Sequence, residues 1–206
     1  LSVRTADAAC LSLKSDGLSA GVLEIGTLDT DLCPVGGVLL DGPVASPSGQ
    51  IRLANAVLPI STRTVRGDLA FGDAMLNWRA ERGVDLTLTA NTLAAPLTVS
   101  GRSLETTGSR VELKSTLGRG DPKVSLSLED AVFGGALIPA DVSAGSVALD
   151  LTSTDAGLQG RGAMENVGIS DFRDDPLYQP LAARFDATLT DGRLSMTGPI
   201  TLETRP

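Results

Sequence analysis

Short runs in which apolar and polar residues alternate fill this chain. In residues 84–89, Val84, Leu86 and Leu88 alternate with Asp and Thr, and the same order recurs in residues 124–129, 147–152 and 184–189. A period of two residues gives a β-strand one apolar and one polar face. The pattern predicts half-buried antiparallel strands rather than the wholly apolar strands of a parallel α/β sheet.

Turn signals separate these runs, at residues 15–17, 72–73, 82–83, 118–122, 154–157 and 190–192. Asp-Gly pairs between alternating strands are typical of hairpins, because Gly supplies the positive φ that such turns need. No segment holds a helical stripe over about 11 residues, and the best helical candidate is a short turn near Asp175. Two non-strand insertions are expected, at 34–47 and 134–144.

We therefore predict one all-β domain over residues 1–206, a long curled antiparallel β-meander with an open groove. The irregular spacing of the strand-turn units favours a meander over a parallel coil. The aromatic fraction is only 3%, whereas a compact sandwich normally uses more of these residues, which bury the most area. A β-sandwich and a β-solenoid are the alternatives.

The composition argues against several functional classes. The chain has no histidine, the commonest general base and metal ligand, and two cysteines cannot supply the four ligands of a structural zinc site. The net charge is −8, and the basic residues are scattered instead of clustered as a phosphate backbone requires. We expect no enzyme, no metal, no cofactor and no nucleic-acid partner.

The ends of the chain predict a fragment. The sequence begins without Met on what looks like a strand, and no stretch approaches the roughly 18 consecutive apolar residues of a membrane span. We expect a piece of a longer polypeptide whose targeting and membrane signals lie outside these residues.

Cys10 and Cys33 are the only cysteines. In an oxidising compartment an even pair at this distance commonly forms a disulfide, worth about 3 kcal/mol in the chain-entropy model. The alternative is two reduced thiols that pack as small hydrophobic side chains.

Three other motifs predict no site. The Arg-Gly-Asp tripeptide at 119–121 fits a hairpin turn that ends in proline. The Gly-Arg-Gly at 160–162 lacks the third glycine and the helix that bind a pyrophosphate. The acidic cluster at 171–175 matches no calcium-loop spacing and suits a solvated loop.

Three phrases carry a resemblance to a known family: "LSAGVLEIGTLDTDLCP" at 18–34, "LQGRGAMENVGISD" at 158–171 and "LAARFDATLTDGRLSMTGPITLET" at 181–204. They resemble the periplasmic parts of the AsmA-like bacterial envelope proteins, most of all the YdbH-type branch, of which TamB is a relative. The resemblance implies a taco-shaped sheet in the oxidising periplasm, in a protein anchored to the inner membrane outside this fragment. Its apolar groove would conduct phospholipid acyl chains toward the outer membrane, and no catalytic motif is carried over.

A sheet with one aliphatic face must cover it with a second sheet, a helix, a partner or lipid. The candidate groove residues are the aliphatic members of the alternating strands, which would equally suit a closed sandwich core: Val84, Leu86, Leu88, Leu126, Leu128, Leu149, Leu151 and Leu189.

We predict a segment of a periplasm-spanning lipid-transfer protein that works without catalysis. Its partners would be phospholipid acyl chains and, through parts outside this fragment, inner- and outer-membrane proteins. The alternative is a secreted or surface β-solenoid, an adhesin-like binding module.

Overall fold

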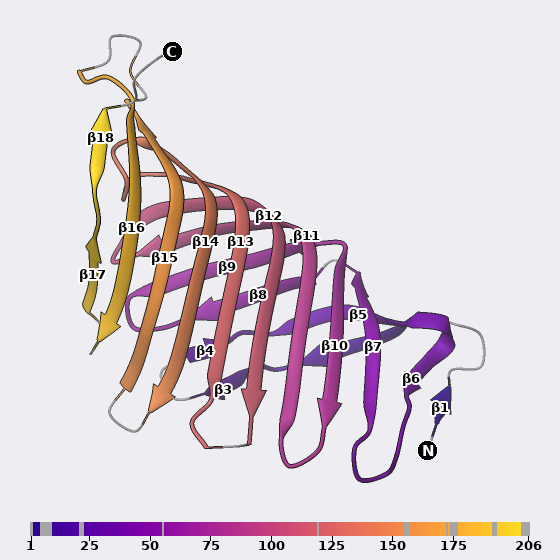
Figure 1. Ribbon diagram of the computed structural model, residues 1–206. Helices are drawn as coiled ribbons and strands as arrows, with labels where there is room; N and C mark the ends of the chain where they lie inside the picture. The colour runs from indigo at the N-terminus through magenta and orange to yellow at the C-terminus, as the bar shows by residue number, and fades with distance from the viewer. Residues whose placement is uncertain are drawn as a thin grey trace.

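The computed structural model describes residues 2–4, 10–20, 23–54, 56–118, 120–154, 157–171, 173, 177–190 and 193–202. Sixteen of its strands form one sheet, and a separate pair joins β1 (Val3–Arg4) to β6 (Val38–Leu40). The only helical element in the described residues is a 3₁₀ turn, Val35–Gly37. All the strand pairs found are antiparallel, and Figure 1 shows a single curled sheet. The predicted meander is confirmed, and the β-solenoid alternative is wrong.

The strands follow one another across the sheet. The first part contains β2 (Leu11–Ser15), β3 (Leu18–Ala20), β4 (Leu23–Ile25), β5 (Leu28–Pro34), β7 (Ser48–Ala54), β8 (Ala56–Ser61), β9 (Val65–Gly72) and β10 (Ala74–Ala80). The second part contains β11 (Val84–Val99), β12 (Arg102–Leu117), β13 (Lys123–Gly134), β14 (Asp141–Thr154), β15 (Gly157–Ser170), β16 (Leu181–Thr190), β17 (Arg193–Thr197) and β18 (Ile200–Leu202).

Several short strands lie end to end. β9 and β10 both pair with β11, in one register along its length, so together they behave as one interrupted strand. The turn predicted at 72–73 is therefore not a hairpin, and the one predicted at 15–17 only separates β2 from β3. β3 and β4 pair with each other, and residues 21–22 between them lie outside the described residues.

The other turn predictions have mixed outcomes. The hairpin at 82–83 joins β10 to β11. The turn at 118–122 lies between the paired strands β12 and β13, although Arg119 lies outside the described residues. Those at 154–157 and 190–192 join paired strands, although residues 155–156 and 191–192 lie outside the described residues, as does the helical candidate at Asp175. The segments 34–47 and 134–144 are not purely irregular, because β6 and the start of β14 lie within them.

A line of irregular residues crosses the middle of the sheet, and we call it the crease. Asp73, Arg110, Asp130 and Asn166 have φ of 50°, 47°, 48° and 52°. The pairing places them in a line across neighbouring strands, with residues 91 and 145 between them. From β10 to β15 the register is the same on either side of the crease, so the irregular residues lie opposite one another. Between β15 and β16 the register shifts by one residue, so Asn166 lies in a β-bulge, which bends the strand and increases its twist. In Figure 1 the strands curve here, and β3, β4, β8 and β9 lie behind the β10–β16 half.

The irregular residues at the crease preserve the face on which the apolar side chains lie. From β9 to β15 the inward apolar positions are two residues apart except across the crease, where they are three apart, whereas β16 keeps a two-residue step throughout. The pairs that flank the crease are Phe71 and Ala74, Ala90 and Leu93, Gly108 and Val111, Leu128 and Ala131, Ala144 and Val147, and Met164 and Val167. One side of the sheet, which we call the concave face, is therefore apolar in both halves.

Burial is deepest along the crease. Most of the buried apolar side chains belong to the pairs just given, and many of them are small. Small residues let the two halves of the sheet approach one another. At Gly108, for example, a Cβ would lie 2.5 Å from Leu128 Cδ1.

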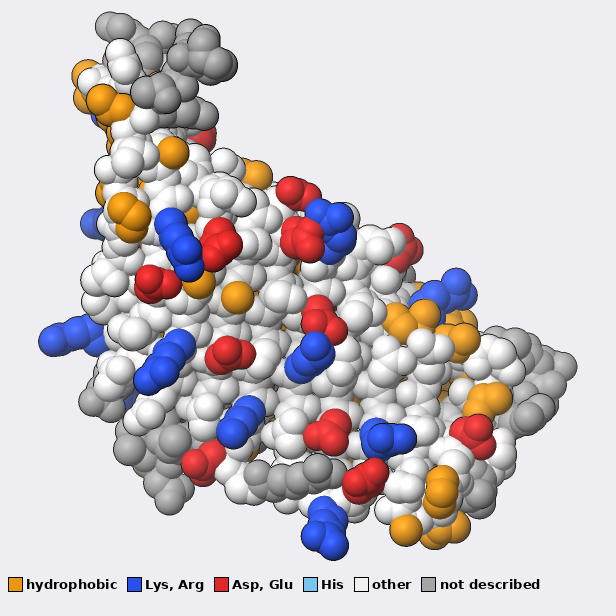
Figure 2. Space-filling view, viewed as in Figure 1, with side chains coloured by type: hydrophobic (Ala, Val, Ile, Leu, Met, Phe, Trp, Pro, Cys, Tyr) orange, Lys and Arg blue, Asp and Glu red, His pale blue; other side chains and the backbone are white. Residues whose placement is uncertain are grey.

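The molecule as a whole exposes a large surface. Its accessible area is 12887 Å², whereas the scaling of area with mass gives about 9,000 Å² for a compact monomer of 21.1 kDa. This excess agrees with an open, curled sheet and not with a closed sandwich. Figure 2 shows the outer face, where acidic and basic side chains are interspersed and hydrophobic ones gather toward the two lateral ends of the sheet.

Candidate functional site: the concave face

The concave face is built of rows that run across the strands, parallel to the crease. Because paired residues in an antiparallel sheet point to the same side, the register assigns each row. One row contains Leu76, Leu88, Leu113, Leu126 and Leu149. The next, farther from the crease, contains Trp78, Leu86, Val124, Leu151 and Leu189.

Charge is almost absent from this face. From β7 to β16 the described inward positions are aliphatic, aromatic, Gly, Ser or Thr, and Arg102 at the start of β12 is their one charged residue. In a chain that is 20% charged, such a separation gives the sheet one strongly apolar and one polar side. The chemistry that the concave face offers is the burial of apolar groups.

The structure places the predicted groove residues on this face at three depths. Leu128 is buried at the crease, with 3% of its surface exposed. Leu88 and Leu126 are partly buried and pack against that core. The remaining five are half-buried: Val84, Leu86, Leu149, Leu151 and Leu189. Of these, Val84 lies beside the β10–β11 hairpin.

Sequence reasoning missed the half of the concave face beyond the crease. Its rows contain Leu58, Leu69, Ala95, Phe133, Val142 and Ile169, and then Ile60, Leu97 and Leu104. If the two-residue alternation of Leu88 and Ala90 is continued along β11, it predicts that Thr92 and Ala94 face inward. In the structure these two residues face outward. The sequence did contain a signal for this half of the face: two apolar residues three positions apart, with an Asp or Asn between them.

Glycines shape the concave face at β15. Gly160 and Gly162, from the Gly-Arg-Gly motif, belong to this strand. A Cβ at Gly160 would lie 2.5 Å from Leu151 Cδ2, and one at Gly162 would lie 3.3 Å from Leu149 Cδ1. The absent side chains leave the space that these two leucines occupy.

The outer side of the crease is polar and cross-linked. Asn91 Nδ2 donates to Asp73 Oδ2 at 3.3 Å, and Ser109 Oγ donates to Asp130 Oδ2 at 2.8 Å. Arg110 forms ion pairs with Glu129 and Asp130. These contacts join neighbouring strands at the crease, so they support the bend from outside.

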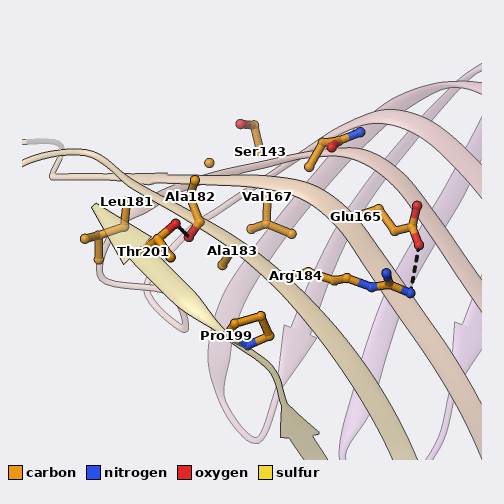
Figure 3. Close-up of a pocket in the computed structure, with 11 residues that line it drawn as sticks. Ser143, Glu165, Val167, Leu181, Ala182, Ala183, Arg184, Pro199 and Thr201 are labelled. Atoms are coloured by element: carbon orange, nitrogen blue, oxygen red, sulfur yellow. Dashed lines mark hydrogen bonds and ion pairs between the residues drawn. The ribbon is translucent and has the colours of Figure 1, made fainter. Parts of the chain in front are cut away.

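A hollow on β14–β16 and β18 is the other feature of note. Figure 3 shows Ser143 and Ala182 on one side of the sheet and Val167 and Ala183 on the other. At its margin Arg184 Nη2 lies 3.1 Å from Glu165 Oε1. The hollow's described lining holds no nucleophile beside a free base, and it offers no catalytic arrangement.

The two cysteines form a disulfide, which confirms that prediction. Their Cα atoms are 4.1 Å apart. Leu11 pairs with Leu32, so Cys10 lies directly opposite Cys33 when this register is continued. Cys33 pairs with Arg52, which is exposed on the outer face, and the disulfide therefore lies on the side away from the apolar rows.

The loop after β15 is organised by Asp171. Its carboxylate accepts hydrogen bonds from Leu177 N at 2.9 Å and Arg173 N at 3.1 Å, and its side chain is 4% exposed. The hydrogen bond from Leu177 is the main reason why the pKa of Asp171 is lowered from its ordinary value. Asp174 and Asp175 lie outside the described residues, and the described ones contain no group of three acidic or cysteine side chains placed to hold a metal.

Comparisons with known proteins give no relative from which a function could be inferred. No family model, no curated protein and no solved structure matches this chain. Among the described residues, no helix has the length and apolar character needed to cross a membrane. The structure defines a class: an open, curled antiparallel sheet with an almost uncharged, mainly aliphatic concave face.

Proposed function

We propose that this chain is a segment of a lipid-transfer protein of the bacterial envelope, and that phospholipid acyl chains lie on its concave face. The observation that carries the proposal is the uncharged aliphatic face, continuous across the strands. Each methylene transferred from water to such a face contributes about 0.8 kcal/mol, so an acyl chain would be held without any specific polar contact.

The shape of the sheet would allow a bound acyl chain to move from strand to strand along the concave face. The aliphatic rows run from strand to strand, and the apolar face continues to the last described strand, where Ile200 and Leu202 are 54% and 63% exposed. Neighbouring rows offer similar surroundings, so a chain could shift from one strand to the next with little change in free energy. No step of this function requires a catalytic group, and the setting in the periplasm rests on the resemblance of the sequence.

The single tryptophan supplies the test. Trp78 lies on the concave face, paired with Leu86 and Gly49. Phosphatidylcholine with brominated acyl chains quenches a tryptophan by contact, so vesicles of this lipid should quench Trp78 more than unbrominated vesicles do. Equal fluorescence with both lipids would contradict the proposal.

Two adjacent substitutions show whether the quenching depends on the concave face. Leu149→Asp places a carboxylate among the aliphatic rows, where its desolvation costs several kcal/mol, and we expect at least a tenfold loss of lipid binding. Ala148→Asp places the same charge on the exposed outer face and should have little effect. Circular dichroism establishes that both variants are folded; unfolding of Leu149→Asp alone would favour a closed core.

A further inference from the structure

Three arginines gather at one rim of the concave face. Arg63 lies in the turn between β8 and β9, Arg66 is the second residue of β9, and Arg102 is the first residue of β12. All three side chains are exposed, and none takes part in the ion pairs found in the described part of the chain. In a chain of net charge −8 they form a local positive site.

A hydrogen bond joins the β8–β9 turn to the β11–β12 turn, which precedes Arg102. Ser100 N, in the β11–β12 turn, donates to Thr64 O, in the β8–β9 turn, at 2.7 Å. Within the second turn, Thr62 Oγ1 accepts from Val65 N at 3.0 Å. The turn that contains Arg63 is therefore fixed against the end of β11.

The register sets the distance between the other two arginines. Arg66 pairs with Thr98 on β11, and Arg102 pairs with Val99 on the same strand. Their Cα atoms are thus two strand spacings apart, about 10 Å. Arg66 projects to the outer face with Thr98, and Arg102 projects to the concave face with Val99. Their guanidinium groups therefore approach one anion from the two sides of the rim, beyond the strand ends.

Apolar rows begin directly beneath this site. Arg102 shares an inward register position with Val99 and Val65, and the next inward row contains Ile60, Leu97 and Leu104. On the outer face, Asp68 and Glu105 lie one row below Arg66 and restrict an anion to the tip of the rim. A cationic rim above an uncharged aliphatic surface is complementary to an amphiphile with an anionic head and an acyl tail.

We infer that Arg63, Arg66 and Arg102 bind the phosphate headgroup of an amphiphile whose acyl chain lies on the concave face, an inference that rests on the proposed function. A guanidinium group presents N–H donors in a planar fork that matches two phosphate oxygens and remains charged at any physiological pH. Inorganic phosphate offers the same oxygens, so the test must separate the headgroup from the free ion.

Calorimetric titrations of the intact chain with three ligands distinguish a headgroup site from a site for free phosphate. The two amphiphiles are used below their critical micelle concentrations. Dodecyl phosphate carries both the head and the tail, dodecyl maltoside the tail alone, and inorganic phosphate the head alone. The variant R63Q/R66Q/R102Q should bind dodecyl phosphate at least tenfold more weakly and dodecyl maltoside as the unmodified chain does. The control R79Q/R82Q/R161Q removes equal charge from exposed arginines elsewhere and should leave both affinities unchanged.

Each outcome decides the inference. Unchanged binding of dodecyl phosphate to the rim variant, or an equal loss in the control, would overturn it. Inorganic phosphate that binds as tightly as dodecyl phosphate would indicate a site for the free ion. If dodecyl maltoside fails to bind but dodecyl phosphate still requires the rim arginines, the acyl-chain proposal fails and the anion site remains. Should the triple variant unfold, the single variants R63Q and R102Q make the same comparison, each with a smaller loss.

Discussion

At the scale of single residues, Gly108 shows how closely the concave face is packed at the crease. A Cβ built there lies 2.5 Å from Leu128 Cδ1 and 2.7 Å from its Cγ, so the whole buried leucine side chain would have to move. We expect Gly108→Ala to lower the free energy of unfolding by about 1–3 kcal/mol through overpacking. Urea denaturation monitored by circular dichroism measures the change.

Gly134 provides the matched control. It also lies in the sheet, at the end of β13, but a Cβ there meets no atom within 4 Å. Gly134→Ala should leave stability unchanged or raise it by up to about 1 kcal/mol, because alanine lowers the conformational entropy of the unfolded chain. A similar loss in both variants would mean that the crease is not tightly packed around Leu128.

Asp171 predicts a pH dependence of defined sign. Its pKa is lowered in the folded state, so the carboxylate stabilises the fold above the pKa of the unfolded chain, near 4. This contribution is lost as the pH falls through the lower folded value. The difference in free energy of unfolding between the unmodified chain and Asp171→Asn should be present at pH 6 and shrink below about pH 4. A difference that stays constant down to pH 2.5 would contradict this account.

At the scale of the elements, the crease explains what the sequence could and could not predict. Alternation identified the strands and one half of the concave face, because period-two order holds on either side of the crease. It gave strands of about six residues where β11 has 16, since the phase changes at Asn91 and the alternation no longer continues. Asp73, Asp130 and Asn166 were available as a signal, because Asp and Asn tolerate positive φ. Arg110 was not, because arginine has no such preference for positive φ.

The bulge at Asn166 can be tested directly. Its φ is 52°, a conformation that glycine adopts freely and a β-branched residue adopts poorly. We expect Asn166→Gly to change stability by less than about 0.5 kcal/mol and Asn166→Val to lower it by roughly 1–2 kcal/mol. Thr188→Val, on the extended outer face of β16, is the control and should be nearly neutral. Equal stability of the two Asn166 variants would argue against the bulge.

The disulfide belongs to the first strands of the sheet. It fastens β2, which pairs only with β5 among the described strands, to the rest of the molecule. We expect Cys10→Ala/Cys33→Ala to lower the free energy of unfolding by about 3 kcal/mol, as loop closure predicts. Faster hydrogen exchange should be confined to the strands before β7. Maleimide labelling of two thiols in denatured, unreduced protein exported to an oxidising compartment would contradict the bond.

At the scale of the whole molecule, the sheet has two ends that the described strands do not cover. Its openness was predictable from the low aromatic content, but the position of the apolar edge depends on the register and was not. At the second end Met196, Ile200 and Leu202 continue the concave face and are 46%, 54% and 63% exposed. An edge strand with unpaired backbone groups and exposed apolar side chains favours pairing with another chain.

We therefore expect this chain to self-associate as its concentration rises, through the β17–β18 edge. Ile200→Lys places a charge among the apolar side chains of that edge and should shift sedimentation-velocity profiles toward the monomer, with little loss of stability because the site is exposed. Thr201→Lys, the next residue, adds the same charge on the outer face and should shift them less. If the unmodified chain remains monomeric at all concentrations, or if the two variants behave alike, the apolar side chains of this edge do not drive association.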